Sequence, residues 1–223
     1  DESLVITSPG KAVIPGRYFI EIMRKIVSNR VEISLIENKM MVIKADRSEF
    51  KLRVMEAEDY PDVDFLDLGK PIVMEAKTLK AIIKETNYAT SQYEKRPILT
   101  GVNLKHEDDK LYCVATDSYR LSQKILQLSH DYEPFNIVIP NRSLDELSRT
   151  LDSINEEVSM FINPNKVLFK FKNILFQTRL LDGVYPDTLR IIPKEFPIIV
   201  KFNKEELLKA VERVSVLSPR EKD

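Results

Sequence analysis

Apolar residues recur along this chain with two spacings, one typical of strands and the other of helices. Val31, Ile33 and Leu35 alternate with polar residues, as they do in a strand that buries one face. Over residues 19–26 the apolar positions lie three and four apart after Pro15, which predicts an amphipathic helix. The same two patterns predict further strands over 50–54, 72–74 and 167–171 and further helices over 77–87, 142–151 and 204–216. The last segment repeats the arrangement of residues 72–87, which predicts a strand near Phe202 as well.

One long segment of the chain is repeated with similar sequence. The sequence VIPGR of residues 13–17 returns as VIPNR at 138–142, and YPD of residues 60–62 returns at 185–187. Both pairs give the same offset of 125 residues (138 − 13 and 186 − 61). Solenoid repeats are about 20–50 residues long, whereas a period of this size is the length of a whole domain. The chain is therefore predicted to contain successive copies of one domain.

A second, weaker repeat relates residues 79–82 to residues 208–211, which are similar in sequence, with an offset of 129 (208 − 79). Asn203 followed by Glu206 predicts a capping box at the start of the last helix. The fold class predicted is α+β, with two helices per domain packed on antiparallel sheets. The order of the repeats predicts the second half of a first domain over 1–68, a complete second domain over 69–193 and the start of a third over 194–223, within a longer protein.

The net charge of the chain is −1, so any attraction to nucleic acid must come from local patches. The predicted helices at 17–26 and 77–87 each carry a net charge of +2, whereas those at 142–151 and 204–216 are balanced. The basic helices either face phosphates or are ordinary solvated surface. No apolar run approaches the roughly 20 residues that span a bilayer, and the single cysteine, Cys113, favours a reducing cytoplasm.

The residue types that carry most enzyme and metal chemistry are scarce in this sequence. His106 and His130 are the only histidines, and neither has a partner at a metal-ligand spacing. Asp62, Asp64 and Asp67 either bind a metal or belong to a solvated connection between domains. Five glycines give no phosphate-binding loop. We therefore predict no cofactor, no metal and no catalytic residue.

The segment ATDSYRL at 115–121 is not explained by a turn alone, because a turn accounts for its Asp and Ser but not for the Tyr, Arg and Leu that follow. Together with LDGVYPD at 181–187 and RPILTGV at 96–102, it resembles the bacterial DNA polymerase III beta subunit, the replication sliding clamp. The resemblance covers essentially the whole chain. Its fold, a DNA clamp, is built from three similar domains in each protomer, as the repeats predict.

The resemblance implies a ring-shaped homodimer that encircles duplex DNA, with helices lining the hole and sheets outside. It also implies a processivity factor without catalysis, which tethers the replicative DNA polymerase, the clamp loader and repair proteins. These partners dock through short linear motifs in a hydrophobic pocket between the second and third domains. Such a pocket combines apolar walls with a few polar groups, and a sliding contact needs basic side chains that touch phosphate without reading bases.

Three sets of site residues follow from the resemblance. The partner-peptide pocket is assigned Leu99, Thr116, Ser118, Tyr119, Arg120, Leu121, Pro186, Arg190 and Ile191. The DNA-facing helices are assigned Arg24, Lys25, Lys77, Lys80, Lys84, Arg142 and Arg149. The dimer interface is assigned Arg47, Phe50, Val216 and Leu217.

Two other classes of protein compete with this interpretation. The first is an enzyme of the same fold that uses Asp117 and Arg120 as site residues. The second is a sequence-specific DNA-binding protein, for which the sequence offers no recognition helix with Asn, Gln and Arg on one face.

Overall fold

The structure is a computed structural model. It describes residues 4–37, 39–55, 60–61, 63–93, 95–128, 131–152, 154–193 and 195–217. Two compact units make up the chain, unit 1 over Asp1–Asp64 and unit 2 over Phe65–Asp223. Within the described ranges, every helix is too short or too polar to cross a bilayer.

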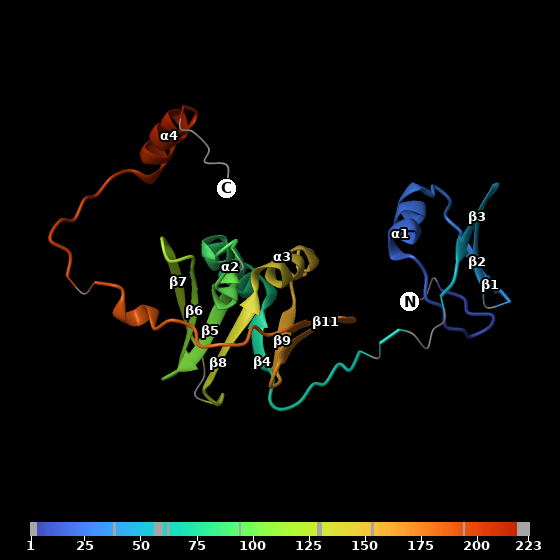
Figure 1. Cartoon of the computed structure of the whole chain (residues 1–223), viewed down its shortest axis with the longest axis horizontal. Coiled ribbons are helices and arrows are strands. Elements are labelled where there is room, and N and C mark those ends of the chain that lie inside the picture. Colours follow the sequence, from blue (N-terminus) through green and yellow to red (C-terminus); the bar gives the residue numbers. More distant parts are fainter. Residues whose placement is uncertain are drawn as a thin grey trace. The chain divides into compact units, whose positions relative to one another are not determined.

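The described residues of unit 1 form one helix and one antiparallel sheet (Figure 1). Its elements are α1 (Gly16–Lys25), β1 (Glu32–Ile36), β2 (Met40–Ala45) and β3 (Ser48–Arg53). The strands lie in the order β1-β2-β3, so β2 is central and contributes the buried Val42 and Ile43. Leu52 of β3 is also buried, and α1 contacts β3. The predicted helix after Pro15 and the two predicted strands are confirmed.

Unit 2 contains two half-units with the same order of elements. The first half-unit is β4 (Ile72–Glu75), α2 (Ala76–Thr86), β5 (Gly101–Glu107), β6 (Lys110–Thr116) and β7 (Leu121–Gln127). The second is β8 (Phe135–Pro140), α3 (Asn141–Thr150), β9 (Glu157–Ile162), β10 (Lys166–Phe171) and β11 (Ile174–Arg179). The short 3-10 helices η2 (Asn87–Ala89), η3 (Pro97–Thr100) and η4 (Thr188–Arg190) and the last helix α4 (Lys204–Ser215) complete it.

The two half-units exchange their first strands. One sheet has the order β7-β6-β5-β8 and the other β11-β10-β9-β4, with antiparallel pairing throughout. β4 therefore pairs with β9 of the second half-unit, and β8 pairs with β5 of the first. Neither sheet can be completed by one half-unit alone.

The repeat found in the sequence is also a repeat of structure. Adding the offset of 125 to the bounds of α1 gives the bounds of α3. The same shift places β1, β2 and β3 within one residue of β9, β10 and β11 at each end. Adding 129 to the bounds of α2 gives 205–215, which coincides with α4 apart from its first residue.

The core of unit 2 lies between its helices and its sheets. α2 and α3 contact each other and lie side by side over the strands (Figure 1). Leu79 and Ile82 of α2, Leu147 of α3, Val102 of β5 and Phe169 of β10 belong to one continuous buried cluster. Each large apolar side chain buried in this way contributes about 1.5–3 kcal/mol relative to exposure. The predicted α+β class, with two helices on antiparallel sheets, is confirmed.

The strand predicted near Phe202 is wrong, because residues 201–203 form no strand and Phe202 is 64% exposed. Its counterpart β4 is a strand because it pairs with β9, and the described residues offer 201–203 no such partner. The helix after it is confirmed. Asn203 caps α4 by accepting hydrogen bonds from the amides of Glu205 at 2.9 Å and Glu206 at 3.3 Å.

Candidate functional site

The turn between β6 and β7 is held by the side chain of Asp117. Its Oδ1 accepts hydrogen bonds from the amides of Tyr119 at 3.0 Å and Arg120 at 2.9 Å, and its Oδ2 lies 3.0 Å from Arg120 Nε. Ser118 adopts a left-handed backbone, with φ of 78°. The Asp117 carboxylate thus closes the turn that carries the Tyr-Arg pair.

The same interactions decide whether Asp117 is a useful base. Burial works against its ionisation, but the amides of Arg120 and Tyr119 and the Arg120 charge outweigh burial and hold the pKa of the carboxyl below its usual value. A general base is most effective when its pKa lies near the working pH. Asp117 is therefore suited to bracing the turn and poorly suited to abstracting protons, which argues against the enzyme interpretation.

Thr116 joins the turn to the LDGVYPD segment. Its Oγ1 donates to the Arg120 carbonyl at 2.7 Å and accepts from the Ser118 amide at 3.1 Å. Its own amide donates to Tyr185 Oη at 3.1 Å. Tyr185 is 8% exposed, and burial raises its pKa to about 12 although the Thr116 amide opposes that shift. Two motifs almost 70 residues apart in sequence (185 − 116) thus meet in one hydrogen bond.

A small apolar cluster, separate from the main core, surrounds Tyr185. Leu99, Val114 and Val138 are buried with it, and the half-buried Leu121 packs against the group. The structure therefore brings Leu99, Thr116 and Leu121 together around Tyr185. Leu99 is only 3% exposed, so it forms the floor of this site and not its wall.

A close approach at Gly101 positions this cluster. A Cβ at this residue would lie 2.5 Å from the Ile139 carbonyl oxygen and 2.8 Å from Val138 Cγ1. Leu181 also approaches closely, and its amide donates to the Val138 carbonyl at 2.9 Å. Only glycine allows β5, β8 and the start of the LDGVYPD segment to pack this tightly.

The remaining residues of the predicted pocket are exposed. Tyr119 is 96% exposed, at the tip of the turn. Pro186 follows Tyr185 directly, and Ile191 is 65% exposed beside η4. Arg190 is exposed, with its Nε 2.9 Å from Asp187 Oδ2. The predicted residues therefore divide into a buried floor and a solvent-facing rim of Ser118, Tyr119, Arg120, Pro186, Arg190 and Ile191.

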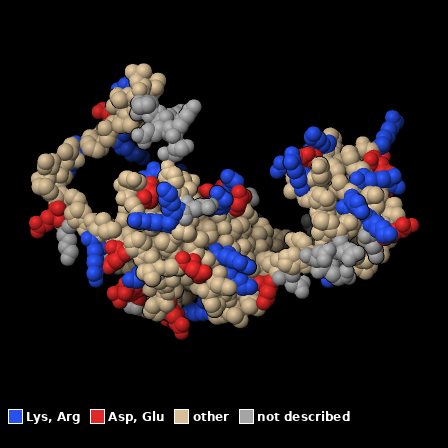
Figure 2. Space-filling view, viewed as in Figure 1, with Lys and Arg blue, Asp and Glu red and all other residues tan. Residues whose placement is uncertain are grey.

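The basic residues predicted to face DNA differ in whether they are paired. Lys77 lies 2.7 Å from Glu75, Lys80 lies 2.6 Å from Asp152, and Arg149 lies 2.6 Å from Glu146. Figure 2 shows positive and negative side chains intermingled over α2 and α3. Within the described part of the chain, no ion pair is formed by Arg24, Lys25, Lys84 and Arg142.

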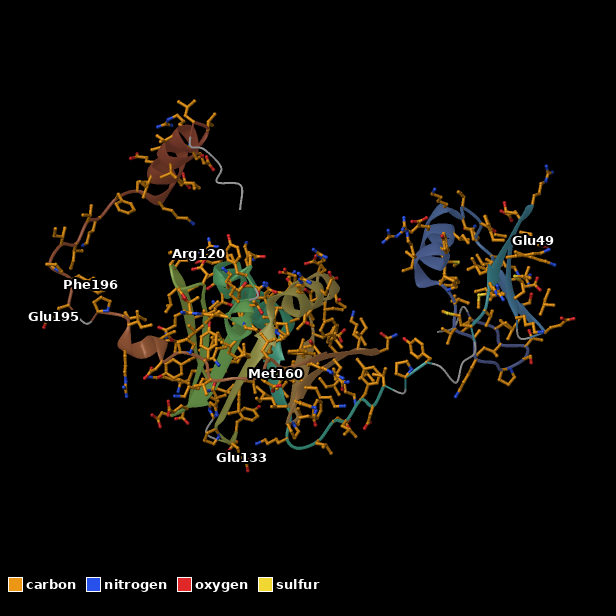
Figure 3. All side chains as sticks on the ribbon, viewed as in Figure 1. Glu49, Arg120, Glu133, Met160, Glu195 and Phe196 are labelled. Carbon is orange, nitrogen blue, oxygen red and sulfur yellow. The ribbon has the colours of Figure 1, made fainter. Side chains whose placement is uncertain are left out.

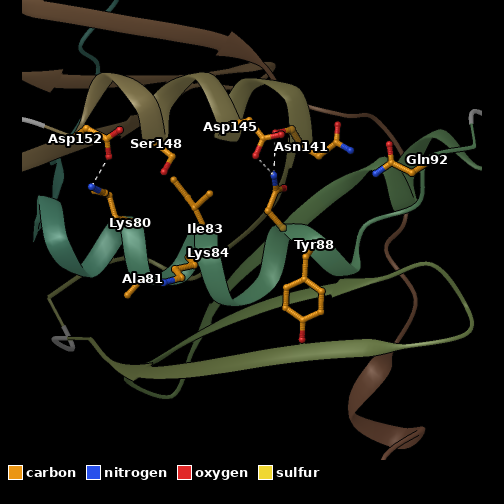
Figure 4. Close-up of a pocket in the computed structure, with 11 residues that line it drawn as sticks. Lys80, Ala81, Ile83, Lys84, Tyr88, Gln92, Asn141, Asp145, Ser148 and Asp152 are labelled. Atoms are coloured by element: carbon orange, nitrogen blue, oxygen red, sulfur yellow. Dashed lines mark hydrogen bonds and ion pairs between the residues drawn. The ribbon is translucent and has the colours of Figure 1, made fainter. Parts of the chain in front are cut away.

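A hollow of about 720 Å³ lies between α2 and α3 (Figure 4). Lys80 and Lys84 of α2 line one side, and Asp145 and Ser148 of α3 line the other. The Lys80–Asp152 ion pair crosses it. The charged side chains of the lining are of both signs, so this face attracts phosphate weakly and does not form a strongly basic groove.

The residues predicted for the dimer interface lie on both units. Arg47 and Phe50 lie at and after the β2–β3 turn of unit 1, where they line a hollow of about 370 Å³. Phe50 is half-buried on β3, the last strand of its sheet among the described residues. Val216 and Leu217, after α4 in unit 2, are 79% and 89% exposed.

Two titratable residues that lack a predicted role, His106 and Cys113, are packed inside unit 2. His106 is buried, its Nδ1 donates to the Glu133 carbonyl at 3.2 Å, and its ring packs on Phe135. Cys113 is buried, which raises its thiol pKa to about 12 although Lys124 opposes the shift. In the described ranges no three His, Cys, Asp or Glu residues gather as metal ligands.

The acidic connection also has a structural explanation where it is described. Asp67 lies 3.4 Å from Lys170, and the carbonyl of Leu66 accepts from Asn163 Nδ2 at 3.0 Å, so this segment is attached to unit 2. Asp62 and His130 lie outside the described residues.

Two residues that support the predicted site from outside its predicted set were missed from the sequence. Tyr185 was recognised within a motif but not as the acceptor that holds Thr116, although the repeated YPD was a signal for it. Tyr88 was missed entirely, and its ring centroid lies 5.9 Å from Arg120 Cζ. No local pattern marks Tyr88, because its contact joins elements 32 residues apart (120 − 88).

Comparison with known families gives matches over most of the chain. The family profile described as "DNA polymerase III beta subunit, central domain" matches residues 73–187, and "DNA polymerase III beta subunit, N-terminal domain" matches residues 2–64. The Beta sliding clamp of Bacillus subtilis strain 168 is 40% identical over 218 residues, which cover 97% of this chain and 58% of that relative. The Beta sliding clamp of Staphylococcus epidermidis is 38% identical over 218 residues, with 98% and 58% covered.

Solved structures agree with these matches. The DNA polymerase III beta chain from Streptococcus pneumoniae TIGR4 superposes with a TM-score of 0.90 at 39% identity, covering 96% of this chain and 57% of that one. The DNA polymerase sliding clamp from Bacillus subtilis gives 0.89 at 41% identity, covering 98% and 58%. The predicted DNA-clamp fold is confirmed. The chain spans about 58% of the length of these curated relatives.

Proposed function

We propose that this chain, which belongs to the DNA polymerase III beta subunit family, is part of a sliding clamp that encircles duplex DNA and keeps replication proteins on it. The observation that carries this proposal is the match in fold over 96% of the chain to a DNA polymerase III beta chain. Clamp function is topological, so it needs a closed ring and a weakly attractive inner face, and not a catalytic centre. The clamp would work in the cytoplasm, without a cofactor.

The domain organisation we propose is the second half of domain I over residues 1–68, domain II over 69–193 and the start of domain III over 194–223. The compact units divide at residue 64, and the family profiles match 2–64 and 73–187, which supports the first boundary. The likeness of α4 to α2 at an offset of 129 supports the second.

The floor and rim around Tyr185 are the proposed docking site for partner peptides. Leu121 offers a half-buried apolar surface, and Arg120 and Arg190 supply exposed charged groups. This combination suits a short extended motif that buries one or two apolar side chains. The replicative polymerase, the clamp loader and repair proteins are the partners we assign to it.

The helices are the proposed DNA-facing side. Arg24, Lys25, Lys84 and Arg142 are exposed and form no ion pair among the described residues, so they are free to contact phosphate. Contacts of this kind are independent of base sequence and weaken steeply with salt. A weak and mobile contact lets a ring slide, whereas a strongly basic surface would hold it in place.

The test of the proposed function is retention on DNA before and after linearisation. The complete protein that carries this sequence is loaded by its clamp loader onto nicked circular duplex and separated from free protein by gel filtration. We expect retention on the circle at moderate salt and release once a restriction enzyme cuts the circle. Retention that is unchanged by linearisation would instead indicate a protein held by direct contacts, and release without cutting would contradict a closed ring.

A further inference from the structure

Arg120 on the exposed rim (Figure 3) is held from two sides. Its Nε lies 3.0 Å from Asp117 Oδ2, and its Cζ lies 5.9 Å from the centroid of the Tyr88 ring. The two contacts use different parts of the guanidinium, because the carboxylate meets the edge of the group and the ring attracts its positive charge. In the described part of the chain the terminal Nη groups of Arg120 make no hydrogen bond. They are available to a ligand.

The backbone that carries Tyr88 is fixed. Asn87 is 9% exposed, and its Nδ2 donates to the Asn141 carbonyl at 3.1 Å and to Asp145 Oδ1 at 2.7 Å. On the other side, Thr90 donates through its Oγ1 to the Asn87 carbonyl at 2.8 Å. Figure 4 shows the Tyr88 side chain pointing away from α3. η2 therefore presents the ring from a position anchored to α3.

The distance between η2 and the turn is also fixed. Lys124 of β7 lies 2.7 Å from Glu85 of α2, and Ser122 Oγ donates to the Glu85 carbonyl. These contacts attach the start of β7 to the end of α2, one turn before Tyr88. The ring and the guanidinium are thus brought together by elements that are each attached independently, and their contact does not depend on flexible segments.

We infer that Tyr88 is a positioning residue for Arg120, and that it raises the affinity of the docking site for partner peptides without belonging to that site. The inference rests on the proposed function. With the guanidinium held over the ring, its free Nη groups face a peptide carbonyl or carboxylate in a fixed orientation, so less side-chain entropy is lost when the peptide binds. Arg120 is 57% exposed and would otherwise sample many rotamers.

The test measures the affinity of the complete clamp for a fluorescent peptide copied from the clamp-binding motif of its own replicative polymerase. Tyr88→Leu is expected to weaken binding about 2- to 5-fold, the range typical of an exposed cation–π contact. Tyr88→Phe should stay within 2-fold of the unmodified protein by the same reasoning, because Phe keeps the ring face. Tyr18→Leu is a matched control, since Tyr18 is 60% exposed and Tyr88 is 59% exposed.

A second series separates the electrostatic role from a structural one. Phe at position 88 is compared with Phe carrying one, two and three ring fluorines, which keep the shape but withdraw charge from the ring face. Stepwise loss of peptide affinity at constant melting temperature is the expected result. In an Arg120→Met background the whole series should bind equally well.

The outcomes distinguish this inference from the proposed function. Fluorination without effect, or a Tyr88→Leu effect that persists in the Arg120→Met background, would overturn the positioning role while leaving the docking site intact. Failure of the unmodified clamp to bind the peptide would overturn the docking site, and the positioning role with it. If Arg120→Met leaves the peptide affinity unchanged, the role of Arg120 in peptide binding is overturned, and with it the role of Tyr88 as its positioning residue. The docking site itself would stand.

Discussion

Tyr185 connects the two motifs of the proposed docking site through one hydrogen bond. Its ring fills the small apolar cluster and its hydroxyl accepts from the Thr116 amide. The amide belongs to a residue that is 8% exposed, so water cannot readily replace the hydroxyl. A buried N–H without an acceptor is costly. The conformation of the turn therefore depends on a phenol that never needs to touch a partner.

Tyr185→Phe should consequently lower the free energy of unfolding by about 1–3 kcal/mol, the cost of one buried amide left without an acceptor. Urea denaturation at neutral pH measures this loss. Tyr119→Phe is the control, because that side chain is 96% exposed and its hydroxyl should contribute nothing to stability. Equal stability of the Tyr185→Phe variant would show that the Thr116 amide finds another partner.

The raised pKa of Tyr185 makes the free energy of unfolding fall at high pH. The neutral phenol is favoured in the folded state, where its pKa is about 12 against an ordinary value of 10.0. Its stabilising effect is therefore complete below pH 10 and is lost as the pH rises toward 12. The Tyr185→Phe variant should lose less stability over this range than the unmodified protein, while Cys113 contributes equally to both.

Gly101→Ala should destabilise unit 2, because the new methyl group would lie 2.5 Å from a backbone carbonyl oxygen that cannot move freely. Overpacking of this kind costs about 1–3 kcal/mol. The measurement is the midpoint of thermal unfolding. Gly16→Ala is the matched control, since nothing lies within 4 Å of its added Cβ and it begins a helix. A neutral Gly101→Ala variant would mean that β8 can shift away from β5.

At the scale of elements, the charges on the helices are only partly available for DNA. Lys84 projects from α2 without an ion pair in the described residues, whereas Lys80 is held by Asp152, the residue two positions after α3. The ion pair with Asp152 offsets much of the attraction of Lys80 for phosphate. If Lys80 left Asp152 to contact DNA, the unpaired carboxylate of Asp152 would repel the phosphate. Two lysines one turn apart on the same helix should thus contribute unequally.

Lys84→Gln should therefore weaken binding of duplex DNA to the complete clamp more than Lys80→Gln does. If Lys84 contacts one phosphate, the plot of the logarithm of the binding constant against the logarithm of the salt concentration becomes less steep by about 0.9 in Lys84→Gln. The comparison is made by fluorescence anisotropy at several salt concentrations below about 100 mM, where salt screens the charges little enough for weak binding to be measured. Equal slopes for both variants would remove Lys84 from the DNA-facing surface.

The elements that sequence patterns predicted well are those that form from local information. The apolar stripes on α1, α2, α3 and α4 and the cap at Asn203 need only neighbouring residues. The strand near Phe202 was predicted by analogy with β4, but a strand exists only where another strand accepts its hydrogen bonds. The spacing of apolar residues indicates which face of a segment would be buried. It does not indicate whether a neighbouring strand is present to pair with that segment.

The site was predictable to the extent that its residues share a short segment. Thr116, Arg120 and Leu121 do, and the structure brings them together with Leu99. Whether a residue forms floor or rim could not be predicted, because burial of Leu99 depends on strands β6 and β8 packing over it. Tyr88 could not be predicted for the same reason, since it reaches Arg120 only after η2 and the turn between β6 and β7 have folded against each other.

At the scale of the whole molecule, the proposed ring requires sheet edges that join one protomer to the next. β3 is an edge strand of the unit 1 sheet among the described residues, and Phe50 lies half-buried on it opposite Ile43. An aromatic side chain on such an edge is the kind of residue that forms the centre of an interface. Val216 and Leu217 supply apolar surface for the other side of the proposed joint.

Phe50→Ala should weaken dimerisation of the complete protein by about 1–3 kcal/mol per joint, as expected for a central anchor residue. Sedimentation equilibrium over a range of concentrations measures the change. Ile33→Ala is the control, because Ile33 is 48% exposed on β1, at the opposite edge of the same sheet. A dimer that tolerates Phe50→Ala and not Ile33→Ala would place the joint at the other edge.

The exchange of first strands between the half-units has a consequence for how this protein folds. β4 and β9 are separated by 82 residues of sequence (157 − 75), so β4 must wait for most of unit 2 before it gains a partner. Such distant pairing slows folding. Two separate copies of a half-unit could complete each other's sheets in the same way, as domain-swapped dimers do. Because both half-units lie in one chain, this association is intramolecular and so independent of concentration.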